Sequence, residues 1–302
     1  MSALLDPELS AGMTAMSGAL SNEIAGWFCV GLSADVAPGT AKPLRFFGRD
    51  YVLLRTESGA ISMLDALCPH LGADLEPTPV LERVGLLMTW RHPRGGPPEW
   101  ALPDWDESGF SAVRGVHTRV STHPQDTSEN SVDLGHFSTA HGYKDVHIHK
   151  PIEVADQRLS ITYRMVRSVP NTRLSMPVQF AVDMWGLGLS IVTFGVIDMP
   201  FEARLFILAS PSDVGKVELR AVTQVRVRGG LLLNAVAPWV RDVANRFVLH
   251  SVSHDVEQDR SMWEHRQVMP RPRVVQGDGP IGRYRSYVPQ FYPTVLGSHG
   301  QG

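Results

Sequence analysis

The order of apolar and polar residues predicts short strands in the first part of the chain. Between residues 26 and 75, short runs of β-branched and aromatic residues are separated by Gly and Asp, which favours antiparallel hairpins. We expect these strands at 44–47, 51–54 and 61–64. The following segment, 93–103, is rich in Gly and Pro and predicts a loop or a boundary.

Longer strands are predicted further along the chain. Apolar and polar residues alternate over 159–165 and, with more charged residues, over 217–227, which is typical of half-buried strands. The segments 190–199 and 203–210 are more continuously apolar, so we expect them in the centre of a sheet.

Two helices are predicted. Residues 128–142 favour a short helix, in which Ser128 caps the N-terminus and Glu129 and Asp133 lie near its positive end. A long helix is expected to begin at Pro238, because proline fits the first helical turn, and to continue to about Glu264.

The predicted apolar face of the long helix consists of Val240, Val243 and Phe247, which fall at helical spacing. The aromatic tail, 277–292, is expected to pack back onto the core. The sum is an α+β fold, with a small N-terminal β module and then an antiparallel sheet with helices on one side.

Composition narrows the classes of function. The chain has 302 residues, ample for one large domain or two modest ones, and a net charge of -3, so it lacks the basic footprint of a nucleic-acid-binding protein. No run of 18 apolar residues predicts a membrane span, and residues 1–25 lack the pattern of a secretion signal, so we expect a cytoplasmic protein. The two cysteines, Cys29 and Cys68, exclude a disulfide framework and a four-cysteine metal site.

Two histidines and a later carboxylate are candidate metal ligands. His136 and His141 lie five residues apart, on or near one helical turn, and can converge on one metal ion. A distant carboxylate would complete a facial triad with open coordination positions. The alternative is that both histidines are surface or capping residues. Asp259, four residues before Trp263, could instead pair with a neighbouring arginine.

The sequence also offers residues for a pocket. His250 and His254 lie one turn apart on the helix that carries Asp259, and could act as acid or base groups because histidine titrates near neutrality. The alternative is that they are helix-surface residues. Ligand pockets are mostly apolar, and the residues expected to line one here, unless they are ordinary sheet core, are Phe180, Met184, Trp185, Leu187 and Leu189.

Six stretches of the sequence together resemble one protein family. They are residues 26–31, 47–50, 64–73, 130–141, 258–264 and 277–292, and they follow the family's order over nearly the whole chain. The chain resembles the oxygenase component of Rieske-type non-haem iron oxygenases, in the branch of ketosteroid 9α-hydroxylase and cholesterol 7-desaturase.

This resemblance implies two domains and a metal. Residues 1–110 would form a Rieske-like β domain, and residues 111–302 a helix-grip, START-like catalytic domain that holds mononuclear Fe(II). Its iron ligands would be His136, His141 and Asp259.

The resemblance also assigns two residues near the ligands and an assembly. Asn130 and Asp133 match positions just outside the ligand set. In the family, the residue at the position of Asp133 bridges to the cluster of a neighbouring subunit in a trimer, so a homotrimer is expected.

The chain departs from the family at its cluster. A Rieske [2Fe–2S] cluster needs two Cys and two His, supplied by the family as Cys-x-His and then Cys-x-x-His. The first pair is present as Cys68 and His70, the second is missing, and Cys29 stands where the family has no ligand.

Two explanations of the missing pair are open. Either residues 89–92 are that pair with Thr89 in place of cysteine, or the whole second ligand hairpin is deleted between Asp74 and Val80. We favour the deletion, because a hydroxyl replaces a thiolate poorly and residues 82–93 resemble the strand that follows the module. Cys68 and His70 would then be relics, and the cluster is expected to be absent.

The expected function follows from retained iron ligands without a cluster. We expect a redox-neutral cyclisation, isomerisation or elimination of a bulky hydrophobic polyketide-, terpenoid- or steroid-like substrate in specialised metabolism, aided by preorganisation and Lewis-acid polarisation. One alternative is a mononuclear iron oxidoreductase, for hydroxylation or desaturation, that uses external electrons. Another is a non-catalytic partner subunit of an intact homologue.

Overall fold

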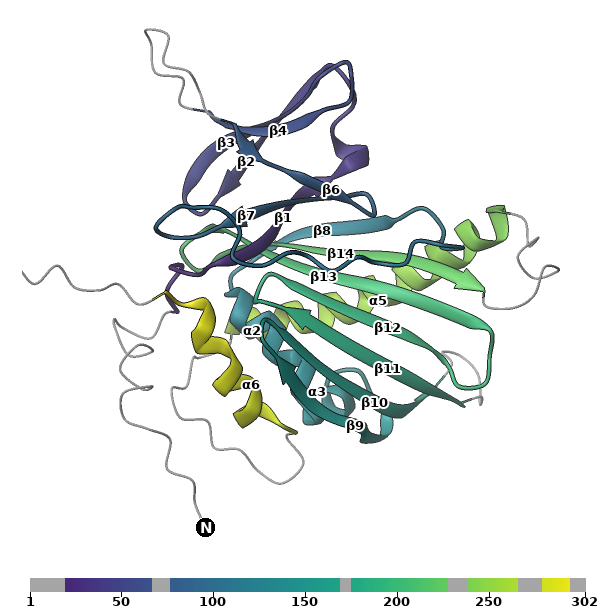
Figure 1. Cartoon of the computed structure of the whole chain (residues 1–302). Coiled ribbons are helices and arrows are strands. Elements are labelled where there is room, and N and C mark those ends of the chain that lie inside the picture. Colours follow the sequence, from purple (N-terminus) through teal and green to yellow (C-terminus); the bar gives the residue numbers. More distant parts are fainter. Residues whose placement is uncertain (1–19, 67–76, 169–174, 228–237, 266–278, 294–302) are drawn as a thin grey trace, which may run out of the picture.

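Antiparallel sheets make up most of the computed structural model, which describes residues 20–66, 77–168, 175–227, 238–265 and 279–293 (Figure 1). Its architecture is α+β, as predicted. Two small sheets come first in the chain, and a seven-stranded sheet follows.

The N-terminal module contains the two small sheets. One has the order β1-β7-β6 and the other β2-β3-β4-β5. The predicted hairpins are confirmed, and β2 joins β3 through Phe47 and Gly48, which both have the positive φ that a two-residue hairpin loop requires. The bounds are β1 (Gly26–Leu32), η1 (Ser33–Asp35), β2 (Thr40–Phe46), β3 (Arg49–Arg55), β4 (Ile61–Asp65), β5 (Thr78–Pro79), β6 (Leu81–Arg83) and β7 (Leu86–Arg91).

The large sheet has the order β8-β14-β13-β12-β11-β10-β9, and all its neighbouring strands are antiparallel. The segments predicted to be central form β12 and β13, which lie inside this sheet, so that prediction is confirmed. The bounds are β8 (Arg114–Val120), β9 (Lys144–Ala155), β10 (Arg158–Ser168), β11 (Ser175–Trp185), β12 (Leu189–Val196), β13 (Phe201–Asp213) and β14 (Lys216–Val227).

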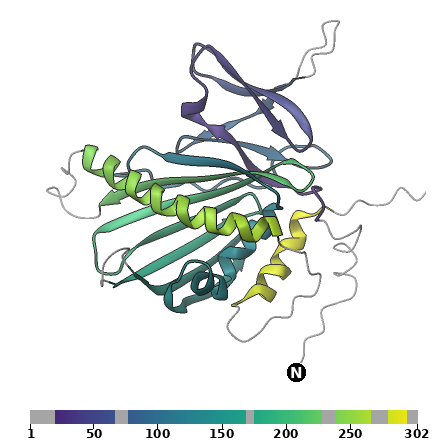
Figure 2. The ribbon, with the colours of Figure 1, turned by 180° about the vertical axis from the view of Figure 1, so that it is seen from behind.

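Helices lie between β8 and β9 and after the large sheet. They are α2 (Pro124–Glu129), η2 (Asn130–Val132), α3 (Leu134–Thr139), α5 (Pro238–His265), α6 (Ile281–Tyr287) and η3 (Val288–Phe291). The long helix α5 crosses the large sheet on the face away from the N-terminal module (Figure 2). Among the described helices, none combines the length and apolarity that a membrane crossing needs.

The tail packs on the core as predicted. Tyr284, Tyr287 and Phe291 are buried in the same cluster as residues of β10 and β11. The Tyr284 hydroxyl donates a hydrogen bond to the carbonyl oxygen of Gln125 in α2 (2.7 Å). Arg285 forms a two-pronged pair with the buried Glu129 at 2.8 and 3.0 Å, which further fixes α6 against α2.

The predicted helix over 128–142 is wrong in its bounds. The chain is helical from Pro124, so Ser128 lies inside α2, where its hydroxyl donates to the Leu187 carbonyl oxygen instead of capping. Asp133 then adopts an extended backbone (ψ 100) and interrupts the helix. Its carboxylate accepts a hydrogen bond from the His136 N–H, which caps the new helix α3.

Strand β14 is more buried than its alternating pattern predicts. Leu219, Ala221 and Val225 pack beneath α5, while Val222 on the other face packs against Trp27 and Met88 of the N-terminal module. The sheet is therefore covered on both sides here, and the polar residues Thr223 and Gln224 are buried as well.

The predicted apolar face of α5 is also wrong. Val243 and Phe247 are 55% and 72% exposed, whereas Val248, Val252 and Val256 face the sheet. The helix is rotated from the predicted orientation because Asn245 is fully buried against β14. Its side chain makes two hydrogen bonds to Thr223 of β14 and one to Ala112.

Strands up to Arg91 belong to the small sheets and strands from Arg114 to the large one. The Pro-rich segment 93–103 between them contains no helix or strand, as predicted. A division at residues 110 and 111 stays a prediction. Both parts share one core, because Phe28 and Leu53 are buried in the same cluster as Leu159 and Tyr163.

Candidate metal site and cavity

Two histidine nitrogens and a carboxylate oxygen meet at one point. The His136 Nε2 atom lies 2.9 Å from Asp259 Oδ1 and 3.0 Å from His141 Nε2. The His141 Nε2 atom lies 3.3 Å from the same carboxylate oxygen. Within the part of the chain that the structure describes, these three side chains are the group of His, Cys, Asp and Glu that could hold a metal ion.

Local structure sets the direction of both histidines. His136 lies in the first turn of α3, whose N-terminus is fixed by the Asp133 cap, and His141 follows the end of that helix. Gly142 has a positive φ of 67°, so the chain reverses directly after His141 and enters β9. The two imidazole rings stand edge to face, at an interplanar angle of 89°.

The third residue comes from α5, and Asn245 anchors that helix. The Asn245 Nδ2 atom donates to the carbonyl oxygens of Ala112 (2.9 Å) and Thr223 (3.0 Å). Its Oδ1 atom accepts from the Thr223 hydroxyl at 2.7 Å. Asn245 thereby fixes the position of α5 along β14, and with it the position of Asp259.

The geometry fits a metal ion held on one face. With ligand bonds of about 2.1 Å, two ligands at right angles lie about 3 Å apart, close to the three separations of 2.9, 3.0 and 3.3 Å. Two imidazoles and one carboxylate are the donor set of the facial triad of non-haem Fe(II) enzymes. His136 Nδ1 is buried and has no hydrogen-bond partner among the described residues.

The charges of the three groups support one another. Burial alone would raise the pKa of Asp259, but hydrogen bonds and positive charge from His136 and His141 bring it below its ordinary value. Burial would lower the pKa of His141, but Asp259 and Gln258 raise it above its ordinary value. The site therefore stabilises a carboxylate beside two imidazoles.

A cavity of about 110 Å³ opens beside the triad. All three metal-ligand candidates line it, and most of the rest of its wall is apolar. The wall comes from both α5 and the facing strands, and includes Phe137, Phe180, Val182, Phe194, Val252 and Trp263.

A polar group at the cavity was missed by sequence reasoning. Asp255, one turn before Asp259 on α5, lines the cavity, and burial raises its pKa above the ordinary value although Arg167 opposes this. The Arg167 Nη2 atom lies 3.5 Å from Asp255 Oδ2 and donates to the Ser251 hydroxyl at 2.5 Å. The same guanidinium lies over the ring of Tyr143 at 5.5 Å. The four-residue spacing of Asp255 and Asp259 was the available signal.

The predicted pocket residues are only partly brought to the cavity. Phe180 lines it. Met184 and Leu187 are buried in the core further along, and Leu189 packs in the cluster beneath the N-terminal module. Trp185 points to the opposite face of the sheet, where it lines a separate cavity of about 270 Å³. Met184, Leu187 and Leu189 are therefore ordinary core residues, as the alternative had it.

Asn130 and Asp133 are placed differently from each other. Asn130 lines the cavity, and its Nδ2 atom is buried without a hydrogen-bond partner among the described residues. Asp133 caps α3 through the His136 backbone. A bridging role for Asp133 between subunits of a trimer stays a prediction.

The structure does not bring His250 or His254 to the cavity. Both are exposed, because the valines of α5 and not these histidines face the sheet. Neither histidine lines the cavity, whereas Asp255 does. The His254 side chain instead contacts Gln258.

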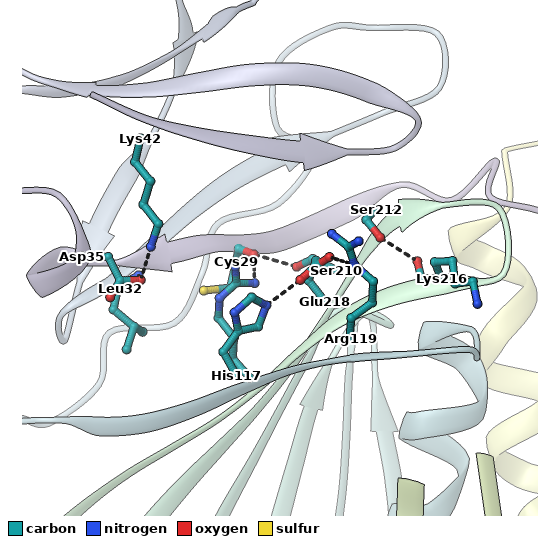
Figure 3. Close-up of polar contacts among 11 residues, drawn as sticks. Cys29, Leu32, Asp35, Lys42, His117, Arg119, Ser210, Ser212, Lys216 and Glu218 are labelled. Atoms are coloured by element: carbon teal, nitrogen blue, oxygen red, sulfur yellow. Dashed lines mark hydrogen bonds and ion pairs between the residues drawn. The ribbon is translucent and has the colours of Figure 1, made fainter. Parts of the chain in front are cut away.

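Cys29 is a core residue of strand β1. Its side chain is fully buried, and its Sγ donates to the Gly31 carbonyl oxygen at 3.3 Å. Its own carbonyl oxygen accepts from the Ser210 hydroxyl (2.7 Å) and from Arg220 (3.3 Å), which fastens β1 to the large sheet (Figure 3). Burial also raises the pKa of the thiol, which disfavours the thiolate form that a cluster requires.

Of the other residues considered at the cluster, the structure describes Thr89 and His92. Cys68, His70 and Asp74 lie outside the described residues. Thr89 is buried in β7, and its hydroxyl donates to the Pro79 carbonyl oxygen at 2.9 Å. The His92 Nε2 atom lies 3.6 Å from a Glu99 carboxylate oxygen.

Two family models match the chain. The model of the 3-ketosteroid 9α-hydroxylase C-terminal domain matches residues 89–292, and that of the Rieske [2Fe–2S] domain matches residues 26–87.

Curated relatives agree with these models. A cholesterol 7-desaturase of Ciona intestinalis is 25% identical over 336 aligned residues, covering 88% of this chain and 68% of the relative. The oxygenase component of a 3-ketosteroid-9-alpha-monooxygenase of Rhodococcus rhodochrous is 22% identical, covering 88% and 83%.

A solved structure shares the fold. Dicamba monooxygenase bound to dicamba superposes with a TM-score of 0.67 at 14% identity, covering 88% of this chain and 96% of that one.

Proposed function

This chain belongs to the family of Rieske-type non-haem iron oxygenases, and from that premise we propose that it is a metal-dependent enzyme that acts on an apolar substrate without a [2Fe–2S] cluster of its own. The observation that carries the proposal is a metal triad at ligand spacing in a chain with only two cysteines, one of which is buried in β1. A Rieske cluster needs two cysteines and two histidines.

Further observations support the absence of the cluster. Cys29 is enclosed by the apolar cluster that includes Trp27, Leu86 and Met88. The alignment with the Ciona relative spans 336 positions, more than the 302 residues of this chain, so the relative carries segments that this chain lacks. The residues present do not fit the cluster, and no step of the proposed reaction passes through it.

The chemistry we favour is a redox-neutral rearrangement, such as an isomerisation or a cyclisation. A metal ion held by His136, His141 and Asp259 would supply Lewis-acid polarisation. Asp255 is the group that transfers a proton, because its burial and raised pKa keep it protonated at higher pH than an ordinary aspartate. Asn130, with its unpartnered Nδ2, donates a hydrogen bond to a substrate oxygen.

The cavity favours an apolar substrate with one oxygen function. Its aromatic and aliphatic wall contacts the hydrocarbon part of the substrate, and the Arg167–Asp255 pair binds the oxygen function. Pockets for drug-sized ligands have about 300–1,000 Å³, so about 110 Å³ encloses part of a steroid-sized substrate rather than all of it. The relatives act on cholesterol and 3-ketosteroids by name, which supports a polycyclic substrate.

The second candidate is oxidation of such a substrate with electrons from a separate redox protein. It is favoured by the relatives, which are named as a desaturase and a monooxygenase. The two candidates differ in whether a reductant and oxygen are needed.

The test begins with the metal and sulfide content of the purified protein. We expect a metal ion in the wild type, none in His136→Ala, and no acid-labile sulfide. Acid-labile sulfide together with a Rieske-type spectrum would refute the cluster-free proposal.

Turnover is then measured anaerobically, without reductant, on a panel of polycyclic ketones. A product of unchanged mass and altered retention, lost in Asp255→Asn at unchanged metal content, supports the rearrangement. Products that form only when oxygen and a reductant are present would refute the rearrangement and support the second candidate.

A further inference from the structure

A chain of polar contacts leads from His141 away from the cavity. The His141 Nδ1 atom lies 3.0 Å from the Gln258 amide oxygen Oε1. The Gln258 amide nitrogen Nε2 lies 3.3 Å from His254 Nε2. Gln258 precedes Asp259 on α5, and His254 lies one turn earlier on the same helix.

The direction of the amide determines which nitrogen of His141 carries the proton. An amide oxygen only accepts hydrogen bonds and an amide NH₂ only donates them. With Oε1 facing it, His141 Nδ1 carries the proton and donates, so the Nε2 lone pair points to the place where His136 and Asp259 converge. This is the tautomer that a metal ion needs.

His254 resists a flip of the amide. In this orientation the Gln258 NH₂ group donates to His254 Nε2, whereas a flipped amide would require the other tautomer of His254, with its proton on Nε2. Metal-bound histidines usually donate their other N–H to a fixed partner, and loss of that partner typically costs about 10–100-fold in metal affinity. His136 Nδ1 lacks such a partner among the described residues. The geometry of the site therefore depends more on the orientation of the His141 ring.

We propose that Gln258 is a positioning residue for the metal ligand His141 and that His254 holds the Gln258 amide in its working orientation. This inference rests on the proposed metal site. It gives exposed His254 a role at a distance from the cavity.

The test is the affinity for Co(II), measured by competition with a fluorescent chelator, which needs no substrate. Gln258→Met keeps the length of the side chain and removes the acceptor, and we expect its affinity to fall by about 10–100-fold. Gln258→Glu restores an acceptor and should bind at least as tightly as the wild type. His254→Leu should lie between the wild type and Gln258→Met.

Controls separate positioning from folding. Glu257→Gln changes the exposed neighbour of Gln258 and should leave the affinity unchanged. The urea midpoint of each metal-free variant shows whether it folds as the wild type does.

The outcomes distinguish the two proposals. If the wild type fails to bind Co(II), the proposed function fails at its metal site. If the wild type binds and Gln258→Met binds equally well, only the positioning role is refuted. If Gln258→Met is weakened but Gln258→Glu is not restored, a hydrogen bond to His141 is not the cause, and the positioning role is refuted as well.

Discussion

Replacement of Asn245 by alanine is expected to destabilise the protein by about 3 kcal/mol. Three hydrogen bonds are lost, to the Ala112 carbonyl oxygen and to the carbonyl and hydroxyl groups of Thr223. Each buried hydrogen bond contributes about 1 kcal/mol net. A change of 3 kcal/mol lowers the folding equilibrium constant about 100-fold.

The assay is urea denaturation of the metal-free protein, followed by circular dichroism. Ser253→Ala is the matched control on α5, because its hydroxyl donates only within the helix, to the Leu249 carbonyl oxygen. We expect that variant to stay within about 0.5 kcal/mol of the wild type. Asn245→Ala should also weaken Co(II) binding, because α5 then loses the contact that fixes Asp259 along the sheet.

Thr223→Val completes a double-mutant cycle. It removes the hydroxyl that Asn245 accepts from, so the two substitutions share one bond and their costs should not add. An Asn245→Ala variant as stable as Ser253→Ala, or fully additive costs, would refute the view that this polar group anchors α5.

Three further predictions concern charges and the cysteine. Burial alone would raise the pKa of Glu218, but hydrogen bonds from His117 and Arg119 lower it to about 2 (Figure 3). The contribution of the Glu218 carboxylate to folding stability is therefore present above its ordinary pKa of 4.5 and is lost as the pH falls from about 4.5 to about 2. Glu218→Gln should therefore melt at a lower temperature than the wild type at pH 7, with the difference vanishing near pH 2; a difference independent of pH would contradict the ion-pair origin. Arg285→Met removes the two-pronged pair with buried Glu129 and should lower the free energy of unfolding in urea by about 3–5 kcal/mol, whereas the double variant with Glu129→Gln should lower it less. Cys29→Ala should leave the metal content per chain unchanged, since the thiol is buried away from the triad; loss of metal with this variant would make Cys29 a ligand.

Periodicity predicted β10, β12, β13 and β14 of the large sheet, because their apolar residues alternate or form continuous runs, but it did not predict β8, β9 or β11. It failed for α5, where Val243 and Phe247 match a helical repeat but lie in solvent. A repeat shows that one face is apolar, not that this face is buried. The decisive residue was the polar Asn245, whose partners in β14 and at Ala112 cannot be read from its own segment.

The three candidate metal ligands were predictable from motif order, but their surroundings were not. His136, His141 and Asp259 come together as the resemblance implied. Strand alternation gives the face of a residue but not its position along the strand, which is why Phe180 lines the cavity and Met184, on the same face of β11, lies in the core. Asp255 carries no motif of its own, and its ion-pair partner Arg167 comes from β10, far away in the sequence.

The triad joins segments that lie on either side of six strands of the large sheet, since His141 precedes β9 and Asp259 follows β14. A metal ion that binds the folded chain and not the unfolded one adds to stability by mass action, about 2.7 kcal/mol at a free concentration one hundred times the dissociation constant. Thermal melting therefore reports how much of the protein is loaded. If the triad holds a metal ion in the cell, a chain without that ion would spend more time unfolded and be removed by proteases sooner, and the amount of this protein would then follow the metal supply.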